Sequence, residues 1–266
     1  MGTTSPKTPL PNLMVAPNGA RRGQSDHAAI PLTDDALVAT AIACQRAGAD
    51  GIHLHLRDNQ GAHLLDADRY RALLARLADA VPDMYLQVTS EAANRYQAAF
   101  QQQIVKDLRP RHVSVALREM VRQGDDWPAA TDFYRWAENN GVEIQHIVYS
   151  VAELQQFLTA CTVGRIAGDH HLLQLVLGTY DGGERSDPRN IAKFTDLMAA
   201  SGLSLDWGLC AFGKEETACL VAAAAQGGKA RVGFENSLWN ADGSVATDNA
   251  ARVYEAKASI KGLVNT

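Results

Sequence analysis

Short apolar runs alternate with longer amphipathic stretches along almost the whole of this 266-residue chain. The runs are typical of buried β-strands, whereas the stretches between them are typical of helices. We predict strands over residues 12–16, 51–56, 84–88, 112–116, 142–149, 172–177, 203–209 and 230–234. We predict helices over residues 34–47, 67–80, 95–108, 129–139, 151–160, 188–200, 214–225 and 248–261. This alternation indicates the α/β class, with a parallel sheet covered by helices.

The number of strands favours a closed (β/α)8 TIM barrel over an open doubly wound sheet in a chain of this length. No G-x-G-x-x-G motif follows the first predicted strand, which argues against a dinucleotide-binding sheet. No linker or change of composition divides the chain. We therefore predict a single barrel domain over residues 11–266, preceded by a flexible tail over residues 1–10.

Composition and charge exclude several classes of partner. The net charge is −5 and no dense block of Lys and Arg occurs, so we expect no nucleic-acid partner. No apolar run is long enough to span a bilayer, so we expect no membrane partner either. The four cysteines are widely separated and form no C-x-x-C pair, which is typical of free thiols in a reducing cytoplasm. We therefore expect a cytoplasmic protein.

Two histidines, His53 and His55, stand two residues apart within the second predicted strand. Side chains alternate between the faces of a strand, so both imidazoles share one face. Such a pair suits a divalent transition metal such as zinc, and the alternative is a pair of core or surface histidines. The end of a barrel strand is also where active sites of this fold lie. Asp58, a few residues further on, could orient one of the imidazoles.

The last predicted strand carries Arg231 and Glu235 on one face and Val232 and Phe234 on the other. We expect the apolar pair to pack on the helices and the charged pair to face the barrel axis, where a charge needs a partner or a metal. Glu235 could complete a zinc site with two histidines and an open position for substrate. The alternative is a structural ion pair between Arg231 and Glu235.

Polar residues follow two other predicted strands and could contact substrate at the same mouth. Thr89, Ser90 and Glu91 end the third strand, although the two hydroxyl groups could instead cap the next helix. Asn18 and Arg21 follow the first strand. A guanidinium group there suits recognition of a carboxylate or phosphate, unless it is solvated surface charge.

Taken together, these segments resemble the β-keto acid cleavage enzymes. The resemblance extends over about residues 15–253 and is carried by four segments: 16–21, 27–33, 53–58 and 231–236. It implies a (β/α)8 barrel with one zinc ion held by His53, His55 and Glu235. It also implies condensation of a β-keto acid with acetyl-CoA, giving acetoacetate and a new acyl-CoA. A homotetramer or other homo-oligomer is expected on the same ground.

The resemblance implies roles for further residues. Arg231 would stabilise developing negative charge or hold a carboxylate, and Ser90 would hydrogen-bond the substrate carboxylate or the thioester oxygen. The family's general base is an aspartate directly after the zinc-binding glutamate, but this chain has Asn236, which cannot accept a proton. Glu91, Glu143 and a zinc-bound hydroxide are the alternatives for this role, and Glu143 could instead form an ion pair at the rim.

Arg21 stands where a family member that acts on an amino substrate has a glutamate for the substrate ammonium. A cationic side chain there should reject an amino substrate and favour one with a distal carboxylate. Two other functions remain open. One is a zinc-dependent aldolase or hydrolase on the same barrel without CoA, and the other is a metal-binding barrel that has lost turnover. Manganese, cobalt or iron would tolerate similar ligands.

Overall fold

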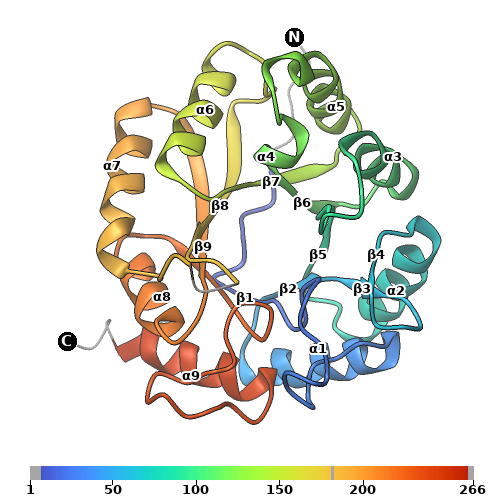
Figure 1. Cartoon of the computed structure of the whole chain (residues 1–266), viewed down its shortest axis with the longest axis vertical. Coiled ribbons are helices and arrows are strands. Elements are labelled where there is room, and N and C mark those ends of the chain that lie inside the picture. The colour runs from blue at the N-terminus through green and yellow to red at the C-terminus, as the bar shows by residue number, and fades with distance from the viewer. Residues whose placement is uncertain (1–6, 181–182, 263–266) are drawn as a thin grey trace.

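The computed structural model describes residues 7–180 and 183–262, and its central feature is a closed barrel of parallel strands (Figure 1). The barrel strands are β1 (Leu13–Val15), β2 (Gly51–Leu54), β5 (Tyr85–Thr89), β6 (His112–Ala116), β7 (Glu143–Val148), β8 (His170–Leu177), β9 (Ser204–Ala211) and β10 (Lys229–Val232). Around the barrel they follow the order β1-β10-β9-β8-β7-β6-β5-β2. The predicted single-domain (β/α)8 TIM barrel is therefore confirmed.

Helices surround the barrel and connect successive strands (Figure 1). They are α1 (Asp34–Ala47), α2 (Ala67–Ala80), α3 (Ala98–Leu108), α4 (Leu117–Met120), α5 (Trp127–Asn139), α6 (Val151–Thr162), α7 (Ile191–Ser201), α8 (Glu216–Ala224) and α9 (Asn249–Gly262). Smaller elements are the hairpin of β3 (Leu56–Arg57) with β4 (His63–Leu64) and the 3-10 turns η1 (Gly124–Asp126) and η2 (Pro188–Asn190). Within the described ranges, no helix is long and apolar enough to cross a membrane. The four cysteines are free thiols, as predicted.

The main apolar core lies between the strands and the helices. Ile52 and Leu54 of β2 pack there with α2 residues such as Leu73 and Leu77, and all four are fully buried. Alternation along β2 therefore directs the intervening residue, His53, toward the barrel interior, as the sequence predicts.

Local sequence sets the ends of α1. The Thr33 hydroxyl accepts a hydrogen bond from the N–H of Ala36 at 3.2 Å and so caps the first turn. Gly48 ends the helix in the left-handed conformation, at φ 106°, and its N–H donates to the carbonyl of Cys44. Both ends agree with the helix predicted over residues 34–47.

The segment after β2 differs from the predicted pattern, because the strand ends at Leu54 and the chain then turns into the β3–β4 hairpin. Arg57 stabilises this path, because its buried guanidinium donates to the carbonyl oxygens of Gly19, Gly61 and Arg22. These bonds hold the loop after β1 against the hairpin. A sequence pattern that gives only the alternation of apolar residues does not reveal them.

Helix α3 also starts later than predicted, at Ala98. Ala93 and Asn94 precede it in the left-handed conformation, at φ 47° and 58°, and Gln97 is the extended N-cap residue. Non-glycine residues adopt this conformation rarely, so the loop between β5 and α3 is held in an unusual path beside the carboxyl ends of the strands.

The first ten residues were predicted to form a flexible tail. Residues 1–6 lie outside the described part of the chain, whereas the next ones contact the amino ends of the barrel strands. Thr8 donates hydrogen bonds from its N–H and its hydroxyl to Glu143, at 3.0 and 3.1 Å. The N–H of Leu10 donates to Asp206 at 2.8 Å. This segment therefore covers the amino end of the barrel, opposite the pocket described next.

Candidate active site

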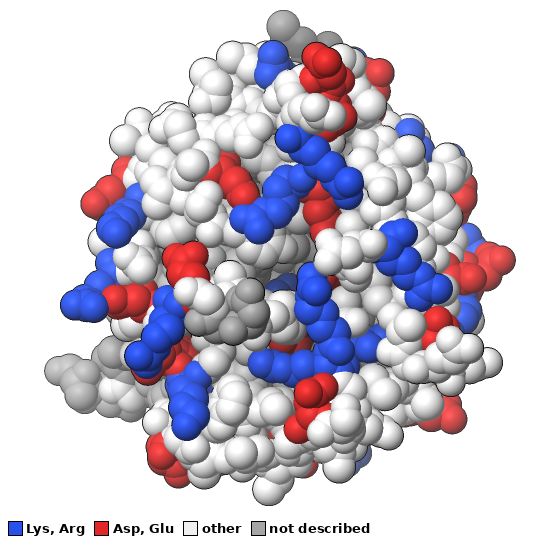
Figure 2. Space-filling model, in the orientation of Figure 1, with Lys and Arg blue, Asp and Glu red and all other residues white. Residues whose placement is uncertain are grey.

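A cavity of about 660 Å³ lies at the carboxyl ends of the barrel strands. Figure 2 shows it as a hollow near the centre of this face, with Lys and Arg side chains around it. Many of the predicted site residues line it: Arg21, His53, His55, Thr89, Glu91, Arg231 and Glu235. The structure thus brings together side chains from the loop after β1 and from the carboxyl ends of β2, β5 and β10 with the residues that follow them.

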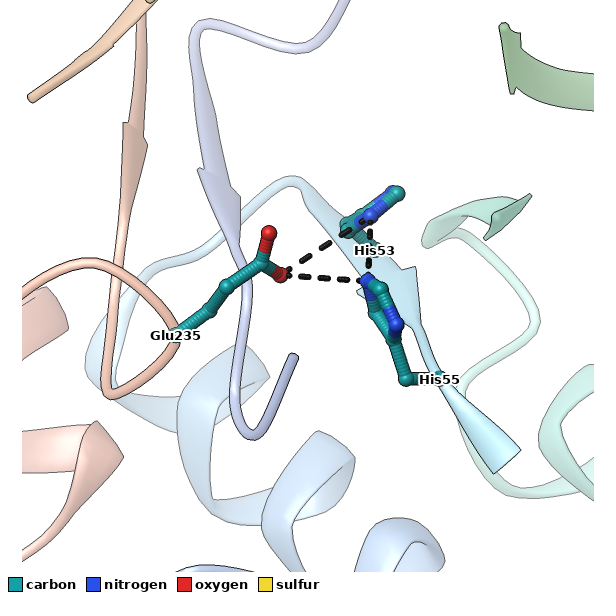
Figure 3. A group of neighbouring side chains, drawn as sticks. All are labelled: His53, His55 and Glu235. Carbon is teal, nitrogen blue, oxygen red and sulfur yellow. Dashed lines mark hydrogen bonds and ion pairs between the residues drawn. The ribbon is translucent and has the colours of Figure 1, made fainter. Parts of the chain in front are cut away.

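His53, His55 and Glu235 converge on one point in the wall of this cavity (Figure 3). The Nε2 atoms of the two histidines are 3.0 Å apart. Oε2 of Glu235 lies 3.4 Å from Nε2 of His55 and 3.8 Å from Nε2 of His53. All three residues are buried. The predicted triad is therefore a compact cluster of one carboxylate oxygen and two imidazole nitrogens.

A glutamine fixes the orientation of His53. Nδ1 of His53 lies 2.8 Å from Oε1 of Gln87, and an amide oxygen can only accept, so Nδ1 carries the proton. The lone pair is then on Nε2, which faces the other two members of the cluster. Gln87 is held in turn, because its amide donates to Gln145, whose amide donates to Gln174. This row of buried amides crosses the barrel interior beneath the site.

The protonation states of His53 and Glu235 suit a metal. Burial lowers the pKa of His53 well below its usual value, so the imidazole is neutral near pH 7. Burial alone would raise the pKa of Glu235, but Arg231 and the two imidazoles outweigh it and hold that pKa well below the usual range. Oε2 of Glu235 has no hydrogen-bond partner among the described residues although it is buried. The neutral imidazole of His53, the neighbouring imidazole of His55 and an ionised carboxylate with an unpaired oxygen therefore fit a divalent transition metal.

The turn after β10 holds Glu235 in place. Gly233 has φ 139°, and a Cβ atom there would lie 2.5 Å from the carbonyl oxygen of Ala16, so the position requires glycine. Its N–H donates to Glu216 of α8 at 3.3 Å, and the N–H of the following residue donates to Asn249 of α9 at 2.9 Å. Two helices therefore fix the path of the chain just before the carboxylate ligand.

Arg231 lies beside the cluster with its side chain buried. Its Nη2 atom is 3.1 Å from Oε1 of Glu235 and 3.2 Å from Sγ of Cys210, while its Nε has no partner within the described ranges. The ion pair that was considered as an alternative is therefore present together with the metal-type cluster. It leaves Oε2 of Glu235 directed at the histidines.

Glu91 lines the cavity on the other side of His55. Its Oε2 is 3.9 Å from Nδ1 of His55, and its side chain is 21% exposed to solvent. The pKa of Glu91 is raised, mainly by burial of its carboxyl group. The nearby carboxylate of Glu235 raises this pKa further, while His55 acts in the opposite direction. Thr89 also lines the cavity, and its hydroxyl accepts the N–H of Glu91 at 3.0 Å. Glu91 is thus a half-buried carboxylate that faces the same space as the cluster.

Three other predicted residues lie close to the site but outside the cavity wall. The amide of Asn18 donates to the carbonyl oxygens of Pro31 and His55, so it links the backbone of one cluster residue to the loop before α1. The Ser90 hydroxyl donates to the carbonyl of Ser114 at 2.8 Å. Asn236 is fully buried after Glu235, and neither of its amide atoms has a partner in the described part of the chain.

Glu143 and Asp58 do not reach the site. Glu143 is the first residue of β7, at the amino end of the barrel, where it binds Thr8 and lies 3.3 Å from Nδ1 of His112. Asp58 accepts hydrogen bonds from its own turn and from Arg95 instead of orienting an imidazole. Gln87 supports His53 instead, and Glu91 lies beside His55.

Sequence reasoning missed Tyr180, which lies in the loop after β8 and lines the cavity. Its hydroxyl is buried and has no hydrogen-bond partner among the described residues. A Cβ atom on Gly19 would lie 2.9 Å from this hydroxyl and 2.5 Å from Cγ of Glu235, so the tyrosine is a close neighbour of the cluster. Burial raises its pKa well above the usual value, and the hydroxyl keeps its proton. A single residue in an irregular loop carries no periodic signal, which is why it was missed.

Known proteins resemble this chain over most of its length. The sequence model of the beta-keto acid cleavage enzyme family matches residues 12–265. The chain is 24% identical over 246 residues to 3-keto-5-aminohexanoate cleavage enzyme of Acetoanaerobium sticklandii, covering 88% of this chain and 86% of that protein. It is 24% identical over 251 residues to 3-oxoadipate:acetyl-CoA acetyltransferase of Cupriavidus necator, covering 92% and 87%.

A solved structure supports the fold. The apo structure of ObcA superposes with a TM-score of 0.66 at 16% identity, over 88% of this chain and 62% of the ObcA chain. At this identity the likeness concerns the barrel alone, and this chain spans less than two thirds of ObcA. The family match covers nearly the whole chain, with His53, His55 and Glu235 inside it. The protein therefore belongs to the beta-keto acid cleavage enzyme family.

Proposed function

We propose that this protein is a zinc-dependent enzyme that condenses a β-keto acid with acetyl-CoA to give acetoacetate and a new acyl-CoA. The observation that carries the proposal is the convergence of His53, His55 and Glu235 at the mouth of a barrel of this family. Both relatives described above are named for reactions of β-keto acids, and one is named as an acetyl-CoA acetyltransferase.

A metal at the cluster and the side chains beside it would have separate roles in the proposed reaction. A metal bound to the triad would supply Lewis-acid stabilisation of the negative charge that develops on the keto acid. The buried guanidinium of Arg231 would hold the substrate carboxylate or a developing oxyanion. The Tyr180 hydroxyl, unpaired and protonated, would donate a hydrogen bond to a substrate oxygen beside Glu235.

Glu91 is the group best suited to remove the proton from C2 of the keto acid. It is a carboxylate in the cavity wall, and its raised pKa brings it closer to the range in which a general base works well. Asn236 cannot accept a proton and lies outside the cavity wall. Glu143 lies at the opposite end of the barrel. These placements support Glu91 as the base.

Arg21 supports a substrate with a distal carboxylate. Its side chain lines the cavity, and its guanidinium carbon lies 5.3 Å from the centre of the Tyr180 ring, over the ring face. A cation at this position attracts a second carboxylate and repels an ammonium group. The Cupriavidus necator relative is named for 3-oxoadipate, a β-keto acid of this dianionic kind. With 3-oxoadipate, the proposed reaction gives acetoacetate and succinyl-CoA.

The test is to incubate the zinc-loaded protein with acetyl-CoA and either 3-oxoadipate or 3-keto-5-aminohexanoate, and to quantify products by mass spectrometry. We expect equal amounts of acetoacetate and succinyl-CoA from 3-oxoadipate, and much slower conversion of the amino substrate. Cleavage of the keto acid without acetyl-CoA would instead favour an aldolase or hydrolase. Zinc binding without conversion of either acid would favour a barrel that has lost turnover.

A further inference from the structure

The cavity extends well beyond the metal-type cluster. The cluster lies at the end of β2, on the residue just after it and on the turn after β10. Tyr96, Gln97 and Arg122 line the cavity from the β5–α3 loop and from the segment after α4. Strand β6, which leads into α4, lies across the barrel from β10. A small keto acid at the cluster therefore leaves this second part of the cavity free. A long co-substrate could run through it to the surface.

Two stacked aromatic rings form a flat surface at that end, here called the aromatic ledge and made of Tyr96 and Phe100. Their ring centroids are 4.9 Å apart and the planes differ by 9°. Tyr96 lines the cavity, while Phe100 lies in the first turn of α3 and is 43% exposed. An exposed ring stacked on a ring of the cavity wall offers a flat apolar face to a planar ligand. A purine base is such a ligand.

Two arginines, Arg118 and Arg122, line the same cavity as Tyr96 of the ledge. Arg122 lines the cavity, and its Nη1 donates to Oε1 of Gln97 at 3.1 Å, while it forms no salt bridge with the residues that the structure describes. Arg118 lines the cavity too, and its guanidinium lies 3.8 Å from the centre of the Tyr149 ring. Glu153 pairs with Arg118 and holds it there. Two arginines, one without a carboxylate partner, therefore face the same opening as the ledge.

Both features match one end of acetyl-CoA, its 3′-phosphoadenosine diphosphate. This group combines a purine ring with several phosphate charges, and arginine binds phosphate through paired N–H groups. We propose that the aromatic ledge binds the adenine and that Arg122, with Arg118, binds the phosphates. The pantetheine arm then follows the cavity to the cluster. This inference rests on the proposed function, because acetyl-CoA is the co-substrate named there.

The experiment compares two acetyl donors, acetyl-CoA and acetyl-pantetheine, which lacks the nucleotide. The quantity measured is kcat/KM for each donor with 3-oxoadipate, in wild type, Arg122→Ala and Phe100→Ala. We expect the preference for acetyl-CoA over acetyl-pantetheine to fall about tenfold or more in each variant, the loss of one good charged or stacking contact. Arg135→Ala is the matched control, because Arg135 is an exposed arginine of α5 that pairs with Asp132. Its preference should equal that of wild type.

An unchanged donor preference in both variants would overturn the inference. So would an equal loss with both donors, because Arg122 would then act on the keto acid or on folding. Calorimetric binding of 3′-phosphoadenosine 5′-diphosphate to the zinc-loaded protein separates this inference from the proposed reaction. Binding that weakens in Arg122→Ala supports the nucleotide site even if no keto acid is converted. No binding to wild type overturns the site even if conversion occurs.

Discussion

Gln87 shows how a residue that contacts neither metal nor substrate can control the cluster. Its amide oxygen fixes the protonated nitrogen of His53, and its NH2 group is held by the amide oxygen of Gln145. A metal-binding imidazole generally depends on such a partner for its tautomer and ring orientation. The row of amides therefore belongs to the site as much as to the barrel core.

Replacing Gln87 with leucine tests this dependence. The variant keeps a similar volume but frees Nδ1 of His53, so zinc affinity should fall by about 10- to 100-fold. The affinity is measured by competition with a chromogenic chelator. Gln102→Leu is the control, because Gln102 is a buried glutamine of α3 that contacts Met120 instead of the cluster. Equal zinc affinity in wild type and Gln87→Leu would contradict this role.

The assignment of the base is also a prediction about single residues. Glu91→Gln removes the proton acceptor and keeps the shape of the side chain, so kcat with 3-oxoadipate should fall by about 100-fold or more. The zinc content should stay at the wild-type level, because the carboxylate is not a member of the triad. Glu143→Gln, at the other end of the barrel, should leave kcat within about twofold of wild type. A larger loss in Glu143→Gln than in Glu91→Gln would reverse the assignment.

A buried histidine in a barrel strand makes the stability of the fold depend on pH. His171 of β8 is buried next to the ring of Phe157 in α6, and burial lowers its pKa to about 4. In the unfolded chain its pKa is near 6.5, so between about pH 4 and 6.5 the unfolded state binds more protons than the folded state. The contribution of neutral, buried His171 to the free energy of unfolding is therefore complete above pH 6.5 and is lost as the pH falls through this window.

His171→Leu should remove this contribution. The free energy of unfolding of wild type should fall on acidification from pH 6.5 to pH 4, and the slope of the variant should be smaller by at most about 1.4 kcal/mol per pH unit. Urea unfolding at several pH values gives both slopes. The residue lies on the helix-facing side of β8, away from the cavity wall, so zinc binding serves as the control and should not change. Identical slopes would show that another group carries the acid sensitivity.

Elements also show where sequence reasoning succeeds. The sequence correctly predicts that His53 and Arg231 point into the barrel. Apolar residues alternate with them along the second and last strands, and successive side chains of a strand point to opposite faces. When the barrel closes, β2 and β10 lie on either side of β1. No local sequence pattern indicates this neighbourhood, but a closed barrel of eight strands requires it. The metal-type cluster was therefore predictable from spacing together with the family resemblance.

Other features depended on contacts that leave no periodic signal. Glu143 shares a face of β7 with the inward Gln145 but is the first residue of the strand. Position along a strand decides which end of the barrel a side chain reaches. The side chain of Asn18 points away from the cavity, because its amide donates to the carbonyl oxygens of His55 and of Pro31 in the loop before α1. Tyr180 comes from an irregular loop, and the left-handed Ala93 and Asn94 shift the start of α3. Only the folded chain reveals these.

In the whole molecule, one end of the barrel is covered and the other is open. The amino end is covered by the segment around Thr8 and Leu10, which binds acidic residues at the starts of β7 and β9. The carboxyl end is open, and its cavity joins the cluster to the aromatic ledge of Tyr96 and Phe100. The candidate site thus lies at the carboxyl end of the barrel, where active sites of this fold are usually found. The homo-oligomer and the cytoplasmic location remain predictions.

The central claim is that His53, His55 and Glu235 together hold one divalent metal ion at this open end. An anomalous difference map from crystals of the zinc-loaded protein, collected at the zinc absorption edge, tests it most directly. The account predicts a single strong peak within about 2.0 to 2.2 Å of both Nε2 atoms and of Oε2 of the glutamate. A strong peak elsewhere on the chain, or none in this cavity from crystals grown with saturating zinc, would contradict it.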